Sequence, residues 1–183
     1  MTDPQVSPAA LGAPALSEGA VVGLAGRLRG ELLRPHQTGY DAARRLWNGQ
    51  IDRRPALIAR CSAVADVIEA VNFARAHNLR LAVRGGGHNV AGLAVCDDGL
   101  MIDLSPLKGI HVDPTAHTAR AQPGVVWGDL DRETQVFGLA TPGGFVSTTG
   151  IAGLTLGGGF GWLSRKHGFT VDNLLAADVV TAD

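Results

Sequence analysis

Glycine clustering is the feature that most restricts how this chain can fold. The 183 residues include 25 glycines, and 18 of them lie between Gly85 and Gly168. Average usage would place roughly 13 glycines in a chain of this length. No Gly-X-Y period is present, which excludes a collagen helix. Because glycine lacks a Cβ, such clusters in an otherwise globular sequence are typical of backbone that closely approaches a ligand.

The charge balance and the cysteine content exclude several classes of protein. Lys and Arg total 16 and Asp and Glu total 17, so the net charge of −1 offers no basic surface to nucleic acid or an anionic membrane. The sequence shows neither an apolar stretch of membrane-spanning length nor a secretory signal pattern. Two cysteines, Cys61 and Cys96, are too few for a disulfide scaffold. We therefore expect a cytoplasmic protein without nucleic-acid or membrane partners.

Apolar residues at helical spacing predict three longer helices, over residues 17–33, 62–78 and 126–137. Ser62 is the expected cap of the second helix. The apolar face of that helix would consist of Val64, Val67, Ile68 and Val71. In the third helix, the side chains expected to face inward are Trp127, Leu130 and Val136.

Short apolar runs predict strands between and after these helices. They cover residues 56–59, 79–84, 100–104 and 174–181, together with a hairpin of 110–113 and 118–122. Strands that alternate with helices and then give way to antiparallel pieces indicate the α+β class. The chain stops at the end of the last expected strand, which suggests a piece of a longer protein.

The first glycine cluster directly follows an expected strand and reads Arg84-Gly85-Gly86-Gly87-His88-Asn89. Successive glycine N–H groups can turn toward one point and form an anion-binding nest, which suits a pyrophosphate. A tight turn between strands is the alternative, but two glycines would satisfy it. Three glycines followed by histidine and asparagine favour the ligand-binding interpretation.

The second cluster places glycines at positions 150, 153, 157, 158, 159 and 161. It is preceded by threonines and lies late in the chain, unlike the dinucleotide fingerprint of the Rossmann fold. Neither a P-loop nor a Gly-x-Ser-x-Gly nucleophile motif occurs in the sequence. Histidine and cysteine residues lack zinc-ligand spacing, so no metal site is predicted. Small residues here would allow a ring system or a phosphate to approach the backbone closely.

In this order and spacing, the two clusters resemble the FAD-linked oxidases of the vanillyl-alcohol oxidase/p-cresol methylhydroxylase (PCMH) superfamily, and within it the berberine bridge enzyme-like branch. The resemblance covers almost everything from about residue 53 to residue 183. Besides the two clusters it includes the segments Ile102–Ser105, Ala121–Gly124, Gly138–Gly144 and Thr170–Leu174. It implies an α+β fold, namely a PCMH-type FAD-binding domain of two small α/β subdomains, the second of them incomplete in this chain.

The resemblance implies a chain organisation and a set of cofactor-binding residues. The parts would be a flexible tail (1–16), an N-terminal helical segment (17–52) and the FAD-binding domain (53–183). His88 matches the histidine that is linked covalently to the C8 methyl group of FAD. The first loop would surround the pyrophosphate with Gly85, Gly86, Gly87, Asn89 and Gly92, and Arg84 would also belong to the cofactor-binding residues. The diphosphate, ribose or flavin edge would be approached by Thr148, Thr149, Gly150, Gly153, Gly157, Gly158, Gly159 and Gly161.

The sequence departs from the family pattern at one position. Some members of the branch carry a second flavin link through a cysteine, and the alignment on Gly150 places Val146 there, followed by Ser147. Neither cysteine of the chain can substitute by position, so attachment through His88 alone is expected. A substrate domain and the usual catalytic base lie beyond Asp183 in the family, so no residue of this chain is assigned as catalytic.

The function implied by the resemblance is that of an FAD-dependent oxidoreductase. A hydride would pass from an organic alcohol or sugar-like substrate to the flavin and then to oxygen or another acceptor. This chain would supply the cofactor-binding part and would be inactive alone. The alternatives are a dehydrogenase subunit that binds FAD non-covalently and a catalytically silent binding module.

Overall fold

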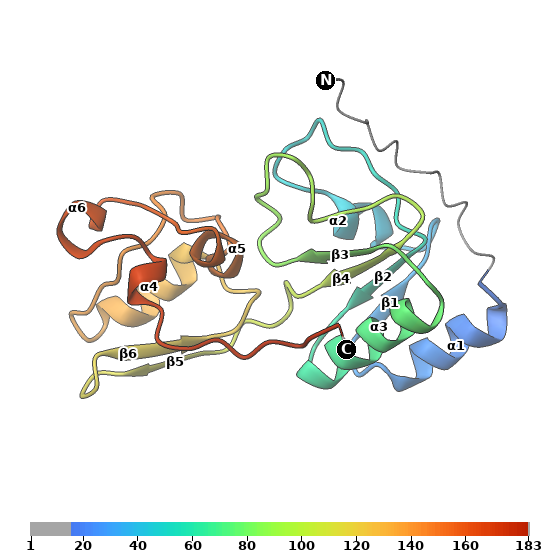
Figure 1. Cartoon of the computed structure of the whole chain (residues 1–183), viewed down its shortest axis with the longest axis horizontal. Helices are drawn as coiled ribbons and strands as arrows, with labels where there is room; N and C mark the ends of the chain where they lie inside the picture. The colour runs from blue at the N-terminus through green and yellow to red at the C-terminus, as the bar shows by residue number, and fades with distance from the viewer. Residues whose placement is uncertain (1–15, 183) are drawn as a thin grey trace, which may run out of the picture.

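The computed structural model describes residues 16–182, which form two lobes (Figure 1). One lobe is built on a four-stranded sheet, and the other contains a β-hairpin with short helices around it (Figure 1). This mixture of helices and small sheets confirms the predicted α+β class. The expected flexible tail lies, except for its last residue, outside the described residues.

The sheet of the first lobe is mixed, with three parallel strands and one antiparallel edge strand. In spatial order its strands are β1 (Glu31–Leu33), β2 (Leu57–Arg60), β4 (Leu100–Asp103) and β3 (Leu81–Arg84). Asp103 of β4 pairs in register with Arg60 on one side and Arg84 on the other. The parallel strands therefore end at one edge, and ligands of open α/β sheets bind beyond this carboxyl edge.

Helices cover both faces of this sheet (Figure 1). They are α1 (Glu18–Arg27) and α3 (Val64–Ala76) on one face and α2 (Tyr40–Arg44) on the other. Leu100 and Ile102 of β4 pack in the core with α1 and α3, whereas Met101 packs with Tyr40 of α2. Because β4 is buried on both faces, it is a continuous apolar run rather than an alternating one.

The chain after α1 does not continue the predicted helix. The helix ends at Arg27, and residues 31–33 form β1, which pairs with β2. A Cβ at Gly30 would overlap the carbonyl oxygen of Arg60, so a glycine lets the chain approach β2 there. The apolar spacing at Leu28 and Leu32 is helical, but strand pairing decides the conformation, because it satisfies the backbone groups of β1.

The buried face of α3 also differs from the expected one. The helix contributes to the core through Ala70, Phe73 and Ala74. Val67 and Val71 pack against this core from its border, but Val64 and Ile68 are 59% and 45% exposed. The prediction chose only β-branched residues for the buried face. It therefore missed the two alanines, which are buried although their side chains carry little apolar area.

The N-terminus of α3 is capped by an aspartate rather than by Ser62. The cap position is Ala63, and the fully buried Asp66 accepts hydrogen bonds from the backbone N–H groups of Ser62 and Ala63. It also accepts from the N–H groups of Arg29 and Gly30. One carboxylate thus connects α3 to the turn between α1 and β1.

The second lobe is small and packs around a tryptophan. Its elements are β5 (Ile110–Asp113), β6 (Thr118–Ala121), α4 (Trp127–Gln135), α5 (Ile151–Leu156), α6 (Ser164–His167) and the 3-10 turn η1 (Val171–Asn173). Val125, Trp127 and Leu130 form the buried core, as expected for the last two. Val136 is 75% exposed because α4 ends at Gln135, so its predicted inward position is wrong.

The last predicted strand is not formed within residues 16–182. Residues 174–181 carry no strand pairing, and Leu175 and Val179 are 82% and 74% exposed. In this segment Asp178 forms a solvent-exposed ion pair with Arg120 of β6, with atoms 2.6 Å apart. An apolar run becomes a strand only when a neighbouring strand supplies hydrogen bonds.

Among the described helices, none has the length and apolar character to cross a membrane.

Candidate cofactor site

The two glycine clusters touch through their backbones, at residues 64 positions apart in the sequence. They meet at Gly86, in the loop after β3, and Gly150, directly before α5. A Cβ at Gly150 would lie 2.5 Å from the backbone nitrogen of Gly86, and a Cβ at Gly86 would overlap the backbone of Gly150. Two loops that the sequence analysis assigned to one ligand are therefore neighbours.

The first loop, residues 85–92, leaves the carboxyl edge of the sheet. A Cβ at Gly85 would lie 2.9 Å from the carbonyl oxygen of Pro123, so this loop also touches the second lobe. Gly87 and Gly92 adopt left-handed conformations with φ of 68° and 73°, which residues with side chains rarely adopt. Glycines in this loop are therefore needed by the backbone conformation and by the contact between lobes, apart from any contact with a ligand.

His88 lies in the first loop with its ring against an indole. The ring centroids of His88 and Trp47 are 4.5 Å apart with an angle of 23° between the planes. The Nε2 atom of His88 is buried and has no hydrogen-bond partner among the described residues. A buried polar atom without a partner is costly and needs an explanation, such as a bound group.

Two other predicted residues of the first loop are engaged within the protein. The guanidinium of Arg84 donates to the carbonyl oxygen of Ala43, and its Nε lies 3.9 Å from a carboxylate oxygen of Asp103. Asn89 accepts a hydrogen bond of 3.0 Å from the backbone N–H of Leu93 through its side-chain oxygen. Asn89 therefore fixes the end of the loop, and Arg84 ties the start of the loop to α2.

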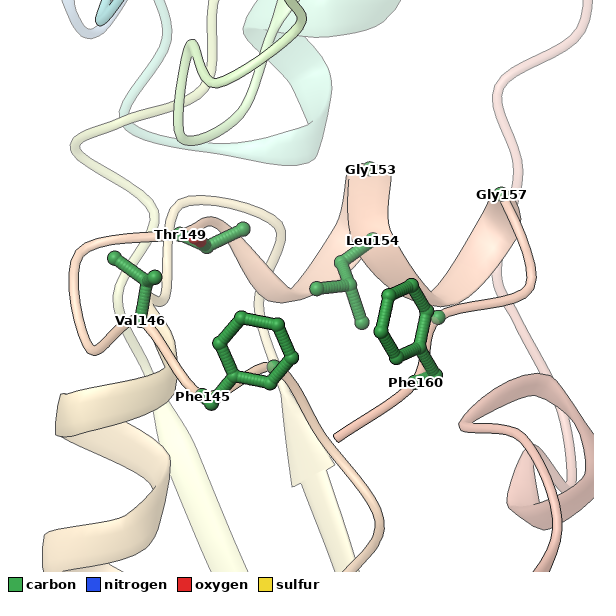
Figure 2. Close-up of a pocket in the computed structure, with 9 residues that line it drawn as sticks. Phe145, Val146, Thr149, Gly153, Leu154, Gly157 and Phe160 are labelled. Atoms are coloured by element: carbon green, nitrogen blue, oxygen red, sulfur yellow. The ribbon is translucent and has the colours of Figure 1, made fainter. Parts of the chain in front are cut away.

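The second loop borders an open cavity of about 310 Å³ (Figure 2). Four of the predicted residues line it, namely Thr149, Gly153, Gly157 and Gly159. The other lining residues are Gly144, Phe145, Val146, Leu154 and Phe160. Figure 2 shows the two phenyl rings on opposite sides of Leu154. An apolar wall with glycine backbone beside it suits a flat ring system.

The remaining residues of the second cluster have other surroundings. Thr148 is exposed and does not line the cavity. Gly158 has a φ of 99°, and a Cβ at Gly161 would overlap the carbonyl oxygen of Gly143. These two glycines are explained by the turn itself, so their contribution to a ligand site stays a prediction.

Within the second cluster, Gly153 differs from the other glycines because nothing in the described protein requires a glycine there. It lies inside α5, has an ordinary helical conformation, and a Cβ built on it would meet no atom within 4 Å. Glycine inside a helix costs about 1 kcal/mol relative to alanine. A partner outside the described residues that approaches this backbone would account for the missing side chain.

The sequence analysis missed three aromatic residues at the site. Trp47 stacks on His88, and Phe145 and Phe160 line the cavity with ring centroids 5.7 Å apart. Trp47, Phe145 and Phe160 are 61%, 54% and 61% exposed, and this exposure of large aromatic rings is visible only in the structure. Within residues 16–182, no cluster of three or more side chains could hold a metal ion.

The two loops touch through glycine backbone, the first of them carries His88, and the second borders an apolar cavity. Such an arrangement would suit a cofactor with a pyrophosphate and a flat ring. Comparison with known proteins identifies the cofactor class. A family model described as "FAD binding domain" matches residues 55–183. The chain belongs to this family.

Relatives support the same assignment. The chain is 42% identical over 155 residues to (R)-6-hydroxynicotine oxidase of Paenarthrobacter nicotinovorans, covering 85% of this chain and 34% of that protein. It is 45% identical over 134 residues to an FAD-linked oxidoreductase of Dictyostelium discoideum, covering 73% and 29%. The chain thus spans about a third of the length of these curated relatives.

Solved structures match the fold as well. The crystal structure of 6-hydroxy-D-nicotine oxidase from Arthrobacter nicotinovorans superposes with a TM-score of 0.83 at 42% identity, covering 85% of this chain and 34% of that one. The BBE-like 1 protein of Physcomitrella patens gives 0.77 at 30% identity, with 83% and 34% covered. The expected PCMH-type fold, the berberine bridge enzyme-like resemblance and FAD as cofactor are confirmed.

Proposed function

We propose that this chain is the cofactor-binding part of an FAD-dependent oxidoreductase in which His88 carries the flavin covalently. The observation that carries the proposal is the position of His88, whose buried and unpartnered Nε2 lies in the loop where the two glycine clusters touch. The FAD-binding domain over residues 53–183 and the N-terminal segment 17–52 are the proposed parts.

Each loop would hold a different part of the cofactor. Backbone N–H groups of Gly85, Gly86 and Gly87 would cradle the pyrophosphate, with Asn89 and Gly92 closing the loop around it. Gly153 and its neighbours at the cavity would approach the diphosphate, ribose or flavin edge. Arg84 would act indirectly, because its guanidinium is bound to the carbonyl oxygen of Ala43.

Covalent attachment is chemically consistent with a histidine at this place. It would form one C–N bond between an imidazole nitrogen of His88 and the C8 methyl carbon, while the N–H bond and one methyl C–H bond break. The two electrons and two protons released would leave the flavin ring in its reduced form, which an acceptor such as oxygen would reoxidise. Val146, at the position of a second attachment in some family members, lines the cavity and has no nucleophile. Cys61 and Cys96 are buried in the first lobe, which supports a single link.

The redox chemistry would be that of the flavin, which accepts a hydride from an alcohol or sugar-like carbon and passes the electrons to oxygen or another acceptor. The chain's own residues would bind and orient the flavin and exclude water from it. The family resemblance places the catalytic base in the part of the full-length protein that follows this chain, so none is proposed here. Both cysteines are free, which supports a reducing compartment such as the cytoplasm.

Acid precipitation of the full-length protein tests the covalent link. We expect yellow, fluorescent flavin in the pellet for the wild type and for His111→Ala, an exposed histidine on β5. His88→Ala should release all flavin into the supernatant and keep the circular dichroism spectrum. Flavin that binds the wild type but is fully extracted by acid would replace this proposal with a non-covalent dehydrogenase. Absence of any flavin would indicate a silent module.

Gly153→Ala separates cofactor contact from protein stability. A Cβ there has space in the protein, so the melting temperature of the flavin-free protein should not fall. The dissociation constant for reversible FAD binding, measured in a His88→Ala background, should rise by at least about tenfold if the cofactor approaches this backbone. Unchanged affinity would remove Gly153 from the proposed site.

A further inference from the structure

A segment that precedes the matched FAD-binding region clamps the loop of His88. The backbone N–H of Trp47 donates to the carbonyl oxygen of Gly87 at 3.1 Å, and the side-chain amide of Asn48 donates to Val90 at 2.9 Å. Arg53 donates to the carbonyl oxygen of Gly92 at 3.1 Å. Residues 47–53 therefore contact the beginning, the middle and the end of this loop, although the family match starts only at residue 55.

Trp47 contacts the imidazole itself. Its indole lies nearly parallel to the ring of His88, with centroids 4.5 Å apart, while the adjacent backbone is fixed to Gly87. The indole is nevertheless 61% exposed, so burial of its own surface is a weak reason for its position. A large aromatic side chain held at the surface against one histidine indicates that its contact with that ring matters.

We propose that Trp47 is a positioning residue that fixes the plane of the His88 imidazole for attachment of the flavin, an inference that rests on the proposed function. A histidine on a glycine-rich loop can rotate among several side-chain rotamers, and only some would align a ring nitrogen with an electrophilic carbon. Stacking on an indole that is tied to the same loop reduces this freedom before the cofactor arrives. Pre-ordering of a nucleophile raises the rate of bond formation without changing its chemistry.

The expected size of the effect follows from aromatic pairing. Contacts between aromatic rings correspond to a factor of roughly two to thirteen in an equilibrium. Trp47→Ala should therefore slow the appearance of acid-stable flavin about three- to tenfold. Trp47→Phe retains an aromatic face and should attach flavin within about twofold of the wild-type rate. A role limited to filling space would be rescued by Trp47→Leu as well as by Trp47→Phe.

The test reconstitutes flavin-free full-length protein with FAD and follows protein-bound flavin fluorescence after acid denaturation over time. Trp47→Leu, which keeps apolar volume without a ring, is the matched control and should be as slow as Trp47→Ala. The melting temperature and the reversible FAD affinity of each variant, measured in a His88→Ala background, should change less than the attachment rate. This pattern would support the positioning role.

Two results would overturn the inference, and a third would overturn its basis. Attachment by Trp47→Ala or Trp47→Leu at the wild-type rate removes the role of the stack. A loss of reversible FAD affinity as large as the loss of rate assigns Trp47 to loop structure instead. Acid-stable flavin in His88→Ala, or none in the wild type, refutes the covalent link through His88 itself and is distinguishable from both.

Discussion

Asp66 is the residue whose replacement should most clearly reveal how the first lobe is held together. Its carboxylate is fully buried and accepts hydrogen bonds from the N–H groups of Arg29, Gly30, Ser62 and Ala63 at 2.8, 3.1, 2.8 and 3.2 Å. These donors belong to the turn before β1 and to the start of α3, far apart in the sequence. Asp66→Asn keeps the shape of the side chain but removes its charge and half of its accepting capacity.

The magnitude follows from the number of donors. Hydrogen bonds to a charged acceptor contribute about 1.5–3 kcal/mol each, and a buried donor left unsatisfied costs about 1–3 kcal/mol. The amide oxygen of Asn could replace the carboxylate oxygen that accepts three bonds, leaving the N–H of Arg29 opposite an amide N–H. We expect Asp66→Asn to lower the free energy of unfolding by about 3 kcal/mol and Asp66→Ala by about 4 kcal/mol.

The same carboxylate should contribute to acid sensitivity. Burial alone raises the pKa of Asp66, but the four backbone N–H groups together outweigh it and hold the pKa below its usual value. Because the folded-state pKa lies below the unfolded one, the stabilisation is present above about pH 4 and is lost as the pH falls through the folded-state value. Stability of Asp66→Asn should therefore depend less on pH in this acidic range.

Urea unfolding followed by circular dichroism measures these differences. Asp113→Asn is the matched control, because Asp113 accepts from two backbone N–H groups in an exposed hairpin turn and should matter much less. A loss below about 0.5 kcal/mol for Asp66→Asn, or an equal loss for both variants, would show that the buried donors find other partners. The argument about Asp66 would then be wrong.

Three further predictions follow from packing and burial. Gly86→Ala should destabilise the protein by about 1–3 kcal/mol, seen as a lower melting temperature, because its Cβ would overlap the backbone of Gly150; an unchanged value would contradict the loop contact. Burial raises the pKa of the Cys61 thiol to about 12 and that of Cys96 above its usual value, so neither should react with a thiol reagent at pH 8 until the protein unfolds. Tyr40→Phe should cost about 1 kcal/mol in urea unfolding, since its buried hydroxyl donates to a backbone carbonyl oxygen at 2.6 Å; an unchanged free energy would show that water replaces this bond.

Local patterns predicted most elements of the first lobe, but the exceptions have a common cause. The strands around residues 57–60, 81–84 and 100–103 were expected because apolar runs and their flanking breakers are local properties. The strand at 31–33 was taken as helix, and the run at 174–181 was taken as strand. In both segments the conformation depends on whether a distant strand is available for pairing, which the local sequence does not encode.

The cofactor site divides in the same way. Both glycine clusters could be found from the sequence, because the number of glycines beside His88 and around Gly153 is larger than a turn requires. That Arg84 binds the carbonyl oxygen of Ala43, and that Trp47 stacks on His88, could not be found there. Those contacts join residues 41 positions apart, and no periodicity relates them.

By itself, the sequence located two glycine-rich loops through their composition, and its resemblance to a known family implied FAD as the cofactor. Only the tertiary structure decided which of those glycines are needed by the protein. Gly86 and Gly150 are required by mutual contact, whereas Gly153 has free space around it. The physical reason is that the absence of a side chain can be seen in a sequence, but the atom that would collide with it belongs to another part of the fold.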